Sequence, residues 1–569
     1  MTVLAALAIA ALTWQPAPDW TDRPDPVADV RAVKGGTVRF SGAQPPKSLN
    51  AYVDGNSYTA MMFSLMYGTL LSNDSETLDF TPSLARRWAV SDDGREFVFE
   101  LDSDAAWSDG SPVTADDVKW TFDAVTAPGA DTGSWKMTLG GFESPEVVGP
   151  RTVRIRKKGG SGRDWRDLMN LGGFYILPSR FFSGRDFNKL EFLDAPVCGP
   201  YRVASVREQI ETVFARVPNW WRANLPSCRY TCNFDRIVMR YHVDNENAFE
   251  ALKKREIDVY PVYTARIMTD ETHGEKFDRN WILRRRVRNH APVGFQGFAM
   301  NLRRKPFDDV RVRRAMAMLI DRERMNRTMM SGEYFLQNSY FQDLYDAAHP
   351  CTNAFYRYDV PAAKRLLAEA GYADGFSFTF LSRGAMEDKF LALFDTALRS
   401  CGIRMEIVRK DFANWMRDMD SFSFDMTWCA WGAGVFRQPE AMWASAEADR
   451  PGSSNVTGFR NEAVDALIAA EKGMATMAER TAAYRAIDAI ATAEAPYAFL
   501  WNTDQTRLLY WNKFGMPRTV LSRFGREDSV LTYWWYDLDR AEELDAAVKN
   551  RTCLPDVPEK VSFDDERRL

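Results

Sequence analysis

One loop of the sequence carries the side chains best suited to holding a small molecule. Trp428 and Trp431 are spaced three residues apart, two glycines follow at Gly432 and Gly434, and Arg437 comes next. Indole rings offer flat apolar surface to a ligand, and a guanidinium group forms paired hydrogen bonds with carboxylate or phosphate. We therefore predict that Trp428, Trp431 and Arg437 bind ligand. Core packing is the alternative for Trp428, which falls at the end of a predicted strand.

Five further side chains are candidates for the same ligand site. Phe295, Gln296 and Asn301 flank a predicted strand that crosses between lobes. Asn56 and Tyr58 lie in an early loop that can face a cleft. Ligand clefts are lined by aromatic side chains and a few polar groups that fix the orientation of the ligand. We predict that these five residues contribute to binding.

The residues that catalysis requires are not grouped in this sequence. Its four histidines form no His-Glu-x-x-His pattern and no close pair, as a histidine-based zinc site would need. The Gly-x-Ser-x-Gly elbow and the phosphate- and dinucleotide-binding glycine motifs are also missing. Adjacent acids such as Asp116 and Asp117 sit at helix starts or turns, which gives no evidence of carboxylates facing each other. We predict no catalytic residue, no metal site and no cofactor, with a secreted hydrolase assembled from distant segments as a less favoured alternative.

Two of the seven cysteines are close in sequence. Cys228 and Cys232 are four residues apart, a spacing that allows a small disulfide loop in an oxidising compartment. Two free thiols, or half of a zinc site, are the alternatives. Because the number of cysteines is odd, at least one thiol stays unpaired.

The length and charge of the chain limit its architecture and its partners. A chain of 569 residues exceeds the size at which a single hydrophobic core stops growing, so we expect two or three lobes. A net charge of −5 argues against a nucleic acid or an anionic membrane as partner. The segment 284–327 differs, with 13 basic and four acidic residues. We interpret it as a solvated basic face, with a docking patch or an anionic-ligand site as alternatives.

The N-terminal residues resemble an export signal. Residues 1–12 are apolar except for Thr2 and are too short to span a bilayer, although the basic n-region of a signal peptide is missing. Residues 16–29 are rich in Pro and Asp, as in a disordered lead. No cysteine precedes Cys198, so no lipid-anchor cysteine lies near the start. We therefore expect an exported protein without a lipid anchor.

The elements that must position these residues follow an α/β pattern. An Asp-Gly turn at 93–94 joins two alternating runs, which predicts a hairpin over 88–101. Thr114, with Asp117 three residues later, predicts a helix start. A helix over 361–370, a strand over 376–381, a helix over 386–401 and a strand over 403–408 then alternate. Such alternation is typical of an α/β lobe with a central sheet.

Several blocks, in order, resemble the family five extracellular solute-binding proteins, the binding components of peptide and nickel ABC importers. The blocks are Thr81–Trp88, Trp107–Val118, Gly199–Tyr201, Val217–Trp221, Glu256–Val259, Asn301–Ala315, Ile320–Arg322 and Asp359–Tyr372. Within that family, four later segments are similar to the YejA-like branch, which is associated with oligopeptides and peptide-derived antibiotics. These segments are Phe424–Met426, Trp443–Ser445, Pro451–Asn455 and Tyr533–Asp537.

The resemblance implies an α/β fold like that of the periplasmic binding proteins (type II, cluster C-like), with two α/β lobes, a hinge and an extra smaller lobe. A signal-like segment and disordered lead at 1–33 would precede lobe I (34–71, 190–294 and 497–569), the extra lobe (72–189) and lobe II (295–496). It also implies a monomer in the periplasm that captures a peptide-like ligand by hinge closure and delivers it to an ABC permease. Trp107 and Asp109 belong to the family signature, and we interpret them as structural residues of a turn.

One position departs from the family pattern. Many peptide-binding relatives carry an Asp after a Trp in this loop, where it holds the α-ammonium of the ligand, whereas Gly434 stands near that position here. A ligand anchored elsewhere, or a non-peptide solute such as an oligosaccharide or a metal chelate, is therefore the alternative.

Overall fold

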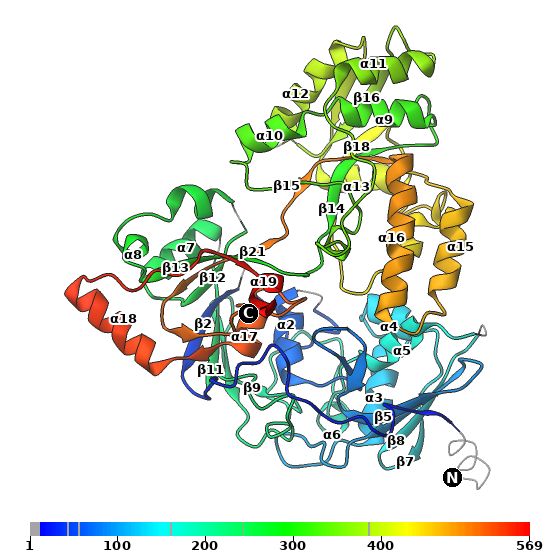
Figure 1. Cartoon of the computed structure of the whole chain (residues 1–569). Helices are drawn as coiled ribbons and strands as arrows, with labels where there is room; N and C mark the ends of the chain where they lie inside the picture. The colour runs from blue at the N-terminus through cyan, green and yellow to red at the C-terminus, as the bar shows by residue number, and fades with distance from the viewer. Residues whose placement is uncertain are drawn as a thin grey trace. The chain divides into compact units, whose positions relative to one another are not determined.

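The computed structural model describes residues 12–42, 45–54, 57–159, 162–242, 244–263, 265–384 and 387–568. It forms two compact units (Figure 1). Unit 1 contains Met1–Asn289 and Thr506–Leu569, and unit 2 contains His290–Gln505. The chain therefore passes between the units twice. The predicted lobe II falls inside unit 2 and the predicted extra lobe falls inside unit 1. The predicted lobe I lies mostly in unit 1, but its residues 290–294 and 497–505 belong to unit 2. Within the described ranges, no helix is long and apolar enough to cross a membrane.

A mixed eight-stranded sheet forms the centre of unit 1. Its strand order is β24 (Lys560–Ser562), β13 (Ile282–Arg288), β21 (Gln505–Trp511), β12 (Val259–Pro261), β2 (Thr37–Gly42), β11 (Arg236–Tyr241), β10 (Glu211–Arg216) and β9 (Tyr201–Arg207). Strand β2 is parallel to both β11 and β12, so these three strands end at the same edge of the sheet. The helices α2 (Ser57–Met66) and α7 (Asn245–Lys253) begin near that edge.

A second sheet of unit 1 contains the predicted hairpin. Its order is β1 (Trp14–Gln15), β5 (Ala85–Val90), β6 (Glu96–Leu101), β8 (Thr152–Arg156) and β7 (Glu146–Gly149). Strands β5 and β6 pair antiparallel across the Asp-Gly turn, which confirms the hairpin. One hydrophobic core contains residues of both sheets, among them Phe40 and Phe99, so the predicted separation of 72–189 as a lobe stays a prediction.

The signature block Trp107–Val118 has a structural role. Helix α3 (Ala115–Thr126) begins after Thr114, whose amide donates to Asp117 Oδ2 at 2.9 Å. The indole Nε1 of Trp107 donates to the same oxygen at 3.4 Å, and the hydroxyl of Ser179 donates to Asp117 Oδ1. Asp117 thus joins a turn, a helix start and a distant segment, which confirms the interpretation of this block as a turn that positions a helix.

Unit 2 is a three-layer α/β structure. Its sheet has the order β17 (Arg404–Arg409), β16 (Ser377–Ser382), β18 (Met426–Trp431), β14 (Phe295–Met300) and β19 (Tyr497–Phe499). Side chains of β14 alternate between two cores, with Phe298 on one face and Ala299 on the other. Such two-sided burial explains the apolar run of this strand. The predicted α/β character of this segment is confirmed.

Helices cover both faces of this sheet. They include α9 (Val310–Met318), α10 (Arg322–Met329), α11 (Val360–Glu369), α12 (Asp388–Arg399), α13 (Phe412–Asp420), α15 (Glu462–Glu471) and α16 (Met477–Glu494). Helices α15 and α16 run side by side (Figure 1). Pro361 lies in the first turn of α11, where its missing N–H leaves no hydrogen bond unmade.

One prediction fails in the structure, and another holds only in part. All seven cysteines are free thiols, so the predicted disulfide between Cys228 and Cys232 is wrong for this structure, and the alternative of free thiols holds. The segment 284–327 is a solvated face only in part: Arg304 and Arg324 are among its exposed residues, whereas Arg285, Arg313 and Arg322 are buried. These buried arginines bond to carbonyl groups of the fold.

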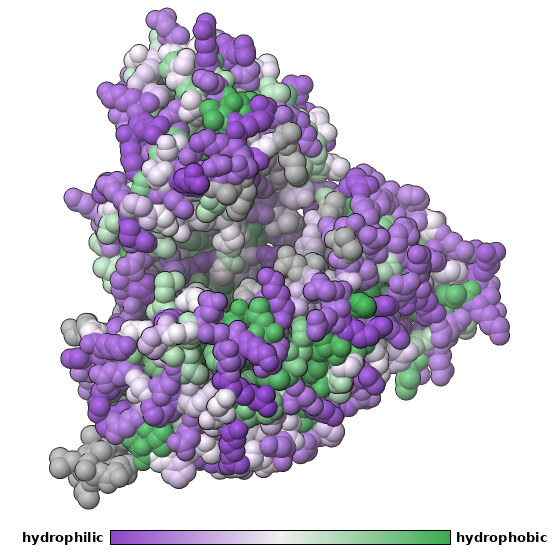
Figure 2. Space-filling model, turned by 180° about the vertical axis from the view of Figure 1, so that it is seen from behind, coloured by the Kyte–Doolittle hydropathy of each residue, from purple (hydrophilic) through white to green (hydrophobic). Residues whose placement is uncertain are grey.

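Exposed large hydrophobic residues are spread along the chain, from Trp20 to Leu538. Figure 2 shows one face of the molecule, on which hydrophilic residues predominate and hydrophobic residues reach the surface in patches. Single exposed hydrophobic residues are normal for a globular protein and mark no site by themselves.

Candidate ligand site

The carboxyl ends of three parallel strands in unit 1 surround a cavity of about 210 Å³. Ligands of α/β proteins bind at this edge, because loops and helix starts gather there. The lining residues come from the ends of β2, β11 and β12 and from the starts of α2 and α7. They are Ser41, Gly42, Tyr58, His242, Asp244, Asn245, Ala248, Tyr260, Pro261 and Tyr263. Of the predicted site residues, Tyr58 lies here, whereas Asn56 lies outside the described residues.

A chain of hydroxyl groups runs along one wall of this cavity. The hydroxyls of Tyr58 and Tyr263 are 3.1 Å apart, and that of Tyr263 donates to Glu527 Oε1 at 2.5 Å. Tyr263 is nevertheless 51% exposed. Its hydroxyl is therefore fixed while its ring remains open to contact, a combination suited to holding apolar and hydrogen-bonding parts of one ligand.

His242 adds a neutral polar group to the cavity. Burial lowers the pKa of His242, and the nearby positive charge of Arg240 lowers it further. The ring Nδ1 is buried and makes no hydrogen bond to any residue that the structure describes. At neutral pH the cavity therefore presents an uncharged imidazole.

We expect the pKa of His242 to lie below 6.5 in the folded protein. Because the unfolded chain then takes up the proton first, this residue's contribution to stability is present above pH 6.5 and is lost as the pH falls towards the folded pKa. An NMR titration of the imidazole resonances, assigned with a His242→Gln variant, measures this directly. A folded pKa at or above 6.5 would contradict the expectation.

In unit 2 the predicted tryptophans lie on β18 beside β14. Trp431 stands opposite Phe295 in the pairing of the two strands, and its Nε1 donates to Tyr497 Oη at 3.2 Å. The Trp431 side chain is partly exposed. Since β16 is parallel to β18, Trp431 also lies at the carboxyl edge of its sheet, where a ligand can reach the ring.

Trp428, in contrast, is part of the hydrophobic core, which was the alternative to ligand binding for this residue. It is 9% exposed and packs against the rings of Phe298 and Phe390. Its Nε1 donates to the side-chain oxygen of Gln296 at 3.2 Å. Gln296 in turn donates to the carbonyl of Trp501 at 2.7 Å, so both side chains bond to groups of unit 2.

Arg437, which the sequence predicts to bind ligand, bonds to other groups of unit 2. Its guanidinium group forms a buried ion pair with Asp343 and donates to Gly434 O at 2.6 Å. Burial raises the pKa of Asp343, although the charge of Arg437 opposes this shift. The ion pair closes the loop 432–439 against the segment that carries Asp343. Arg437 therefore has a structural role in this structure, and ligand binding by Arg437 stays a prediction.

Asn301 and Phe295 are likewise enclosed. Asn301 is fully buried, and its amide donates to the carbonyls of Phe422 and Phe424. Phe295 is 5% exposed and packs edge-on against Tyr340. Both side chains stabilise unit 2 and offer no surface to a ligand in this structure.

Sequence reasoning missed His242, Tyr260 and Tyr263. A signal was present, because Tyr260 follows directly on the block Glu256–Val259. Tyr260 lies in β12 (Val259–Pro261) and Tyr263 follows two residues after the strand, so both rings are near the carboxyl edge of the sheet. His242 directly follows β11, but it reaches the same cavity as Tyr260 of β12 only because β2 pairs with both strands, and no local pattern states this strand order.

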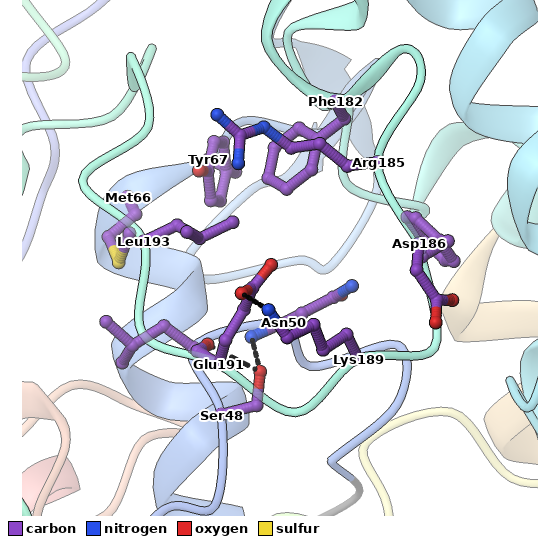
Figure 3. A pocket seen from close by; sticks show the side chains of 12 residues that line it. Ser48, Asn50, Met66, Tyr67, Phe182, Arg185, Asp186, Lys189, Glu191 and Leu193 are labelled. Carbon is purple, nitrogen blue, oxygen red and sulfur yellow. Dashed lines mark hydrogen bonds and ion pairs between the residues drawn. The ribbon is translucent and has the colours of Figure 1, made fainter.

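A further pocket of unit 1 is too small for a ligand (Figure 3). It has a volume of about 20 Å³, room for about one water molecule. Ser48, Asn50 and Glu191 lie on one side, where the Ser48 hydroxyl donates to Glu191 O at 3.1 Å. One side of the pocket is therefore held by a bond between two of its own residues.

Comparison with known proteins agrees with this architecture. The family model of the bacterial extracellular solute-binding proteins, family 5 Middle, matches residues 79–452. The chain is 26% identical to YejA of Escherichia coli K12 over 571 residues, covering 91% of both chains. It is also 26% identical to YejA of Agrobacterium fabrum, named a probable peptide-binding protein, over 558 residues, covering 88% of this chain and 90% of that one.

A solved structure supports the fold. The periplasmic binding protein DppA of Helicobacter pylori, in complex with the peptide STSA, matches with a TM-score of 0.65 and 19% identity. The match covers 89% of this chain and 99% of that one. The expected α/β periplasmic-binding-protein-like fold is thereby confirmed. With the ordered sequence blocks and a family model that spans most of the chain, the protein belongs to the bacterial extracellular solute-binding proteins of family 5.

Proposed function

We propose that this protein is the binding component of an ABC importer and captures a peptide or peptide-derived ligand in the periplasm, without turning it over. Its membership of a solute-binding family supports the first part. The peptide is supported by the name of its Agrobacterium relative and by the peptide bound to the similar Helicobacter protein. An ABC permease of the inner membrane is the corresponding partner.

The observation that carries the ligand class is the pairing of aromatic rings with fixed, neutral hydrogen-bonding groups at the carboxyl edge of the unit 1 sheet. Tyr58 and Tyr263 hold their hydroxyl groups 3.1 Å apart, and Tyr260 and neutral His242 line the same cavity. A peptide offers apolar side chains and uncharged amide groups at short intervals, which such a wall can bind without a buried unpaired charge.

The acid that holds the α-ammonium in many relatives is replaced near Gly434, and Asp343 already pairs with Arg437. Glu440, six residues after Gly434, is the nearest substitute in the loop and lies 3.1 Å from Lys472. We therefore propose that the ligand's amino terminus is held by another acid or is modified. The two chain crossings at 289/290 and 505/506 are where closure of the units on a ligand would bend the chain.

Native mass spectrometry of the protein purified from its own periplasm tests the proposal. A bound mass that fragments into amino acids supports a peptide ligand, and calorimetry with the identified peptide then gives its affinity. A bound mass with no amino acids would favour an oligosaccharide or a metal chelate. Cleavage of the peptide during incubation would instead support a hydrolase.

A further inference from the structure

A second cavity of unit 1 lies apart from the proposed ligand site and shares no lining residue with it. Its volume is about 340 Å³, within the range of small-molecule pockets. It lies among β13, the turn after β22 (Phe514–Gly515), the start of α18 (Leu538–Asn550) and the C-terminal segment with α19 (Phe563–Arg568), whose end is marked in Figure 1. Its charged lining residues are Arg31, Arg285, Arg518, Arg540, Asp537 and Glu566.

Arg285 occupies an unusual place for a charged residue. On β13 it lies between Leu283 and Val287, and both of these belong to the hydrophobic core of unit 1. Because side chains alternate along a strand, Arg285 shares their face. It is only 9% exposed. A strand position of this kind normally carries an apolar residue, and a buried charge is costly unless it is paired.

No carboxylate among the described residues pairs with Arg285. Its Nε donates to the hydroxyl of Tyr510 at 3.0 Å, and Nη1 donates to the carbonyl of Pro558. Both acceptors are neutral, and Nη2 makes no hydrogen bond to any described residue, although Arg285 lines the cavity. The guanidinium group is thus oriented by two bonds, and its charge is left for a partner inside the cavity.

The other charged residues around the cavity leave it with a net positive charge. Arg31 is paired with Asp29, and Arg540 lies 3.5 Å from Asp537. Arg518 is exposed and forms no ion pair within 4.0 Å in the described ranges, although its charge helps to lower the pKa of Asp29. Including Asp29, four guanidinium groups thus face three carboxylates, of which Glu566 is the third. One additional negative charge would balance the site.

Part of the wall is apolar, formed by residues such as Met516, Trp535 and Val561. We infer that this cavity binds a small organic molecule with a single carboxylate or phosphate group. The oxyanion meets Arg285 and Arg518, and its organic part contacts the apolar wall. The inference does not depend on the identity of the imported ligand.

Calorimetry on the full chain, with benzoate and phenyl phosphate as probes and neutral benzamide as control, tests the inference. We expect both oxyanions to bind at one site and benzamide not to bind. The exposed double variant Arg518→Ala, Arg540→Ala should weaken binding at least tenfold, as should Arg285→Gln if its circular dichroism spectrum is unchanged. The tighter of the two probes identifies the oxyanion that the site prefers.

Arg236→Ala is the matched control, since Arg236 is exposed on β11 and does not line the cavity. It should change the affinity by less than twofold. The inference is overturned if neither oxyanion binds at 50 mM, a concentration far above the dissociation constant of a functional site. It is also overturned if Arg236→Ala weakens binding as much as the double variant. Loss of oxyanion binding in Trp431→Ala would also overturn it, because the probes would then occupy the importer's ligand site.

Discussion

Replacing Arg437 by methionine is expected to lower the free energy of unfolding of unit 2 by about 3–5 kcal/mol, the usual cost of removing one partner of a buried ion pair. The side chains of Arg437 and Asp343 are only 4% and 6% exposed. Without the guanidinium group, the Asp343 carboxylate keeps its bond from the amide of Val293 but loses the charge that offsets its burial. The carbonyl of Gly434 also loses a donor.

Hydrogen exchange measures this locally, which matters because a two-unit chain need not unfold in a single step. We expect the hydrogen-bonded amides beside the loop, those of Val293, Trp443 and Ala444, to exchange faster in Arg437→Met than in the wild type. The double variant Arg437→Met, Asp343→Leu is the matched control, because it removes both charges. It should recover most of the lost protection.

The same experiment decides between the two roles of Arg437. If Arg437→Met kept wild-type protection and lost ligand affinity instead, the guanidinium group would act on the ligand, as the sequence alone suggested. The buried ion pair predicts the opposite result. Arg437→Met should lower stability, and ligand affinity should fall only as far as the loop 432–439 changes its conformation.

Local patterns predicted the elements of this fold well. The hairpin of β5 and β6 follows from an Asp-Gly turn between alternating runs, and α11 follows from a proline in its first turn and Gly371 after its end. These signals concern neighbours in sequence, where backbone preference and side-chain period determine the structure. They do not depend on which segments later come together.

The side-chain roles depend on distant partners and were therefore harder to predict. Arg437 resembled a ligand fork because Asp343, 94 residues earlier, is invisible to a local pattern. Asn301 similarly bonds to carbonyls more than 100 residues away. In each case the buried polar group is hydrogen-bonded inside the protein, as buried polar groups normally are. Trp431 keeps its candidate role because its ring remains partly exposed at the end of β18.

Trp431→Ala is expected to weaken binding of the imported ligand by about tenfold to a hundredfold, or about 1.4–2.8 kcal/mol, the range in which a central aromatic contact contributes to binding. Its indole is positioned by the bond to Tyr497 and by pairing with Phe295. The ring is thus held in place before the ligand arrives, which keeps the entropic cost of binding low. Calorimetry with the ligand identified by mass spectrometry measures the change.

Two matched variants separate contact from fold in this measurement. Trp431→Phe keeps an aromatic ring and loses only the Nε1 donor, so it should retain most of the affinity. Trp20→Ala removes an indole that is 41% exposed in unit 1 and should leave the affinity unchanged. If Trp431→Ala bound the ligand as tightly as the wild type while its folding remained intact, Trp431 would only cover the core, and the aromatic contacts would have to come from the tyrosines of unit 1. The affinity of Tyr263→Ala would then show the larger loss, because Tyr263 is the most exposed of those rings.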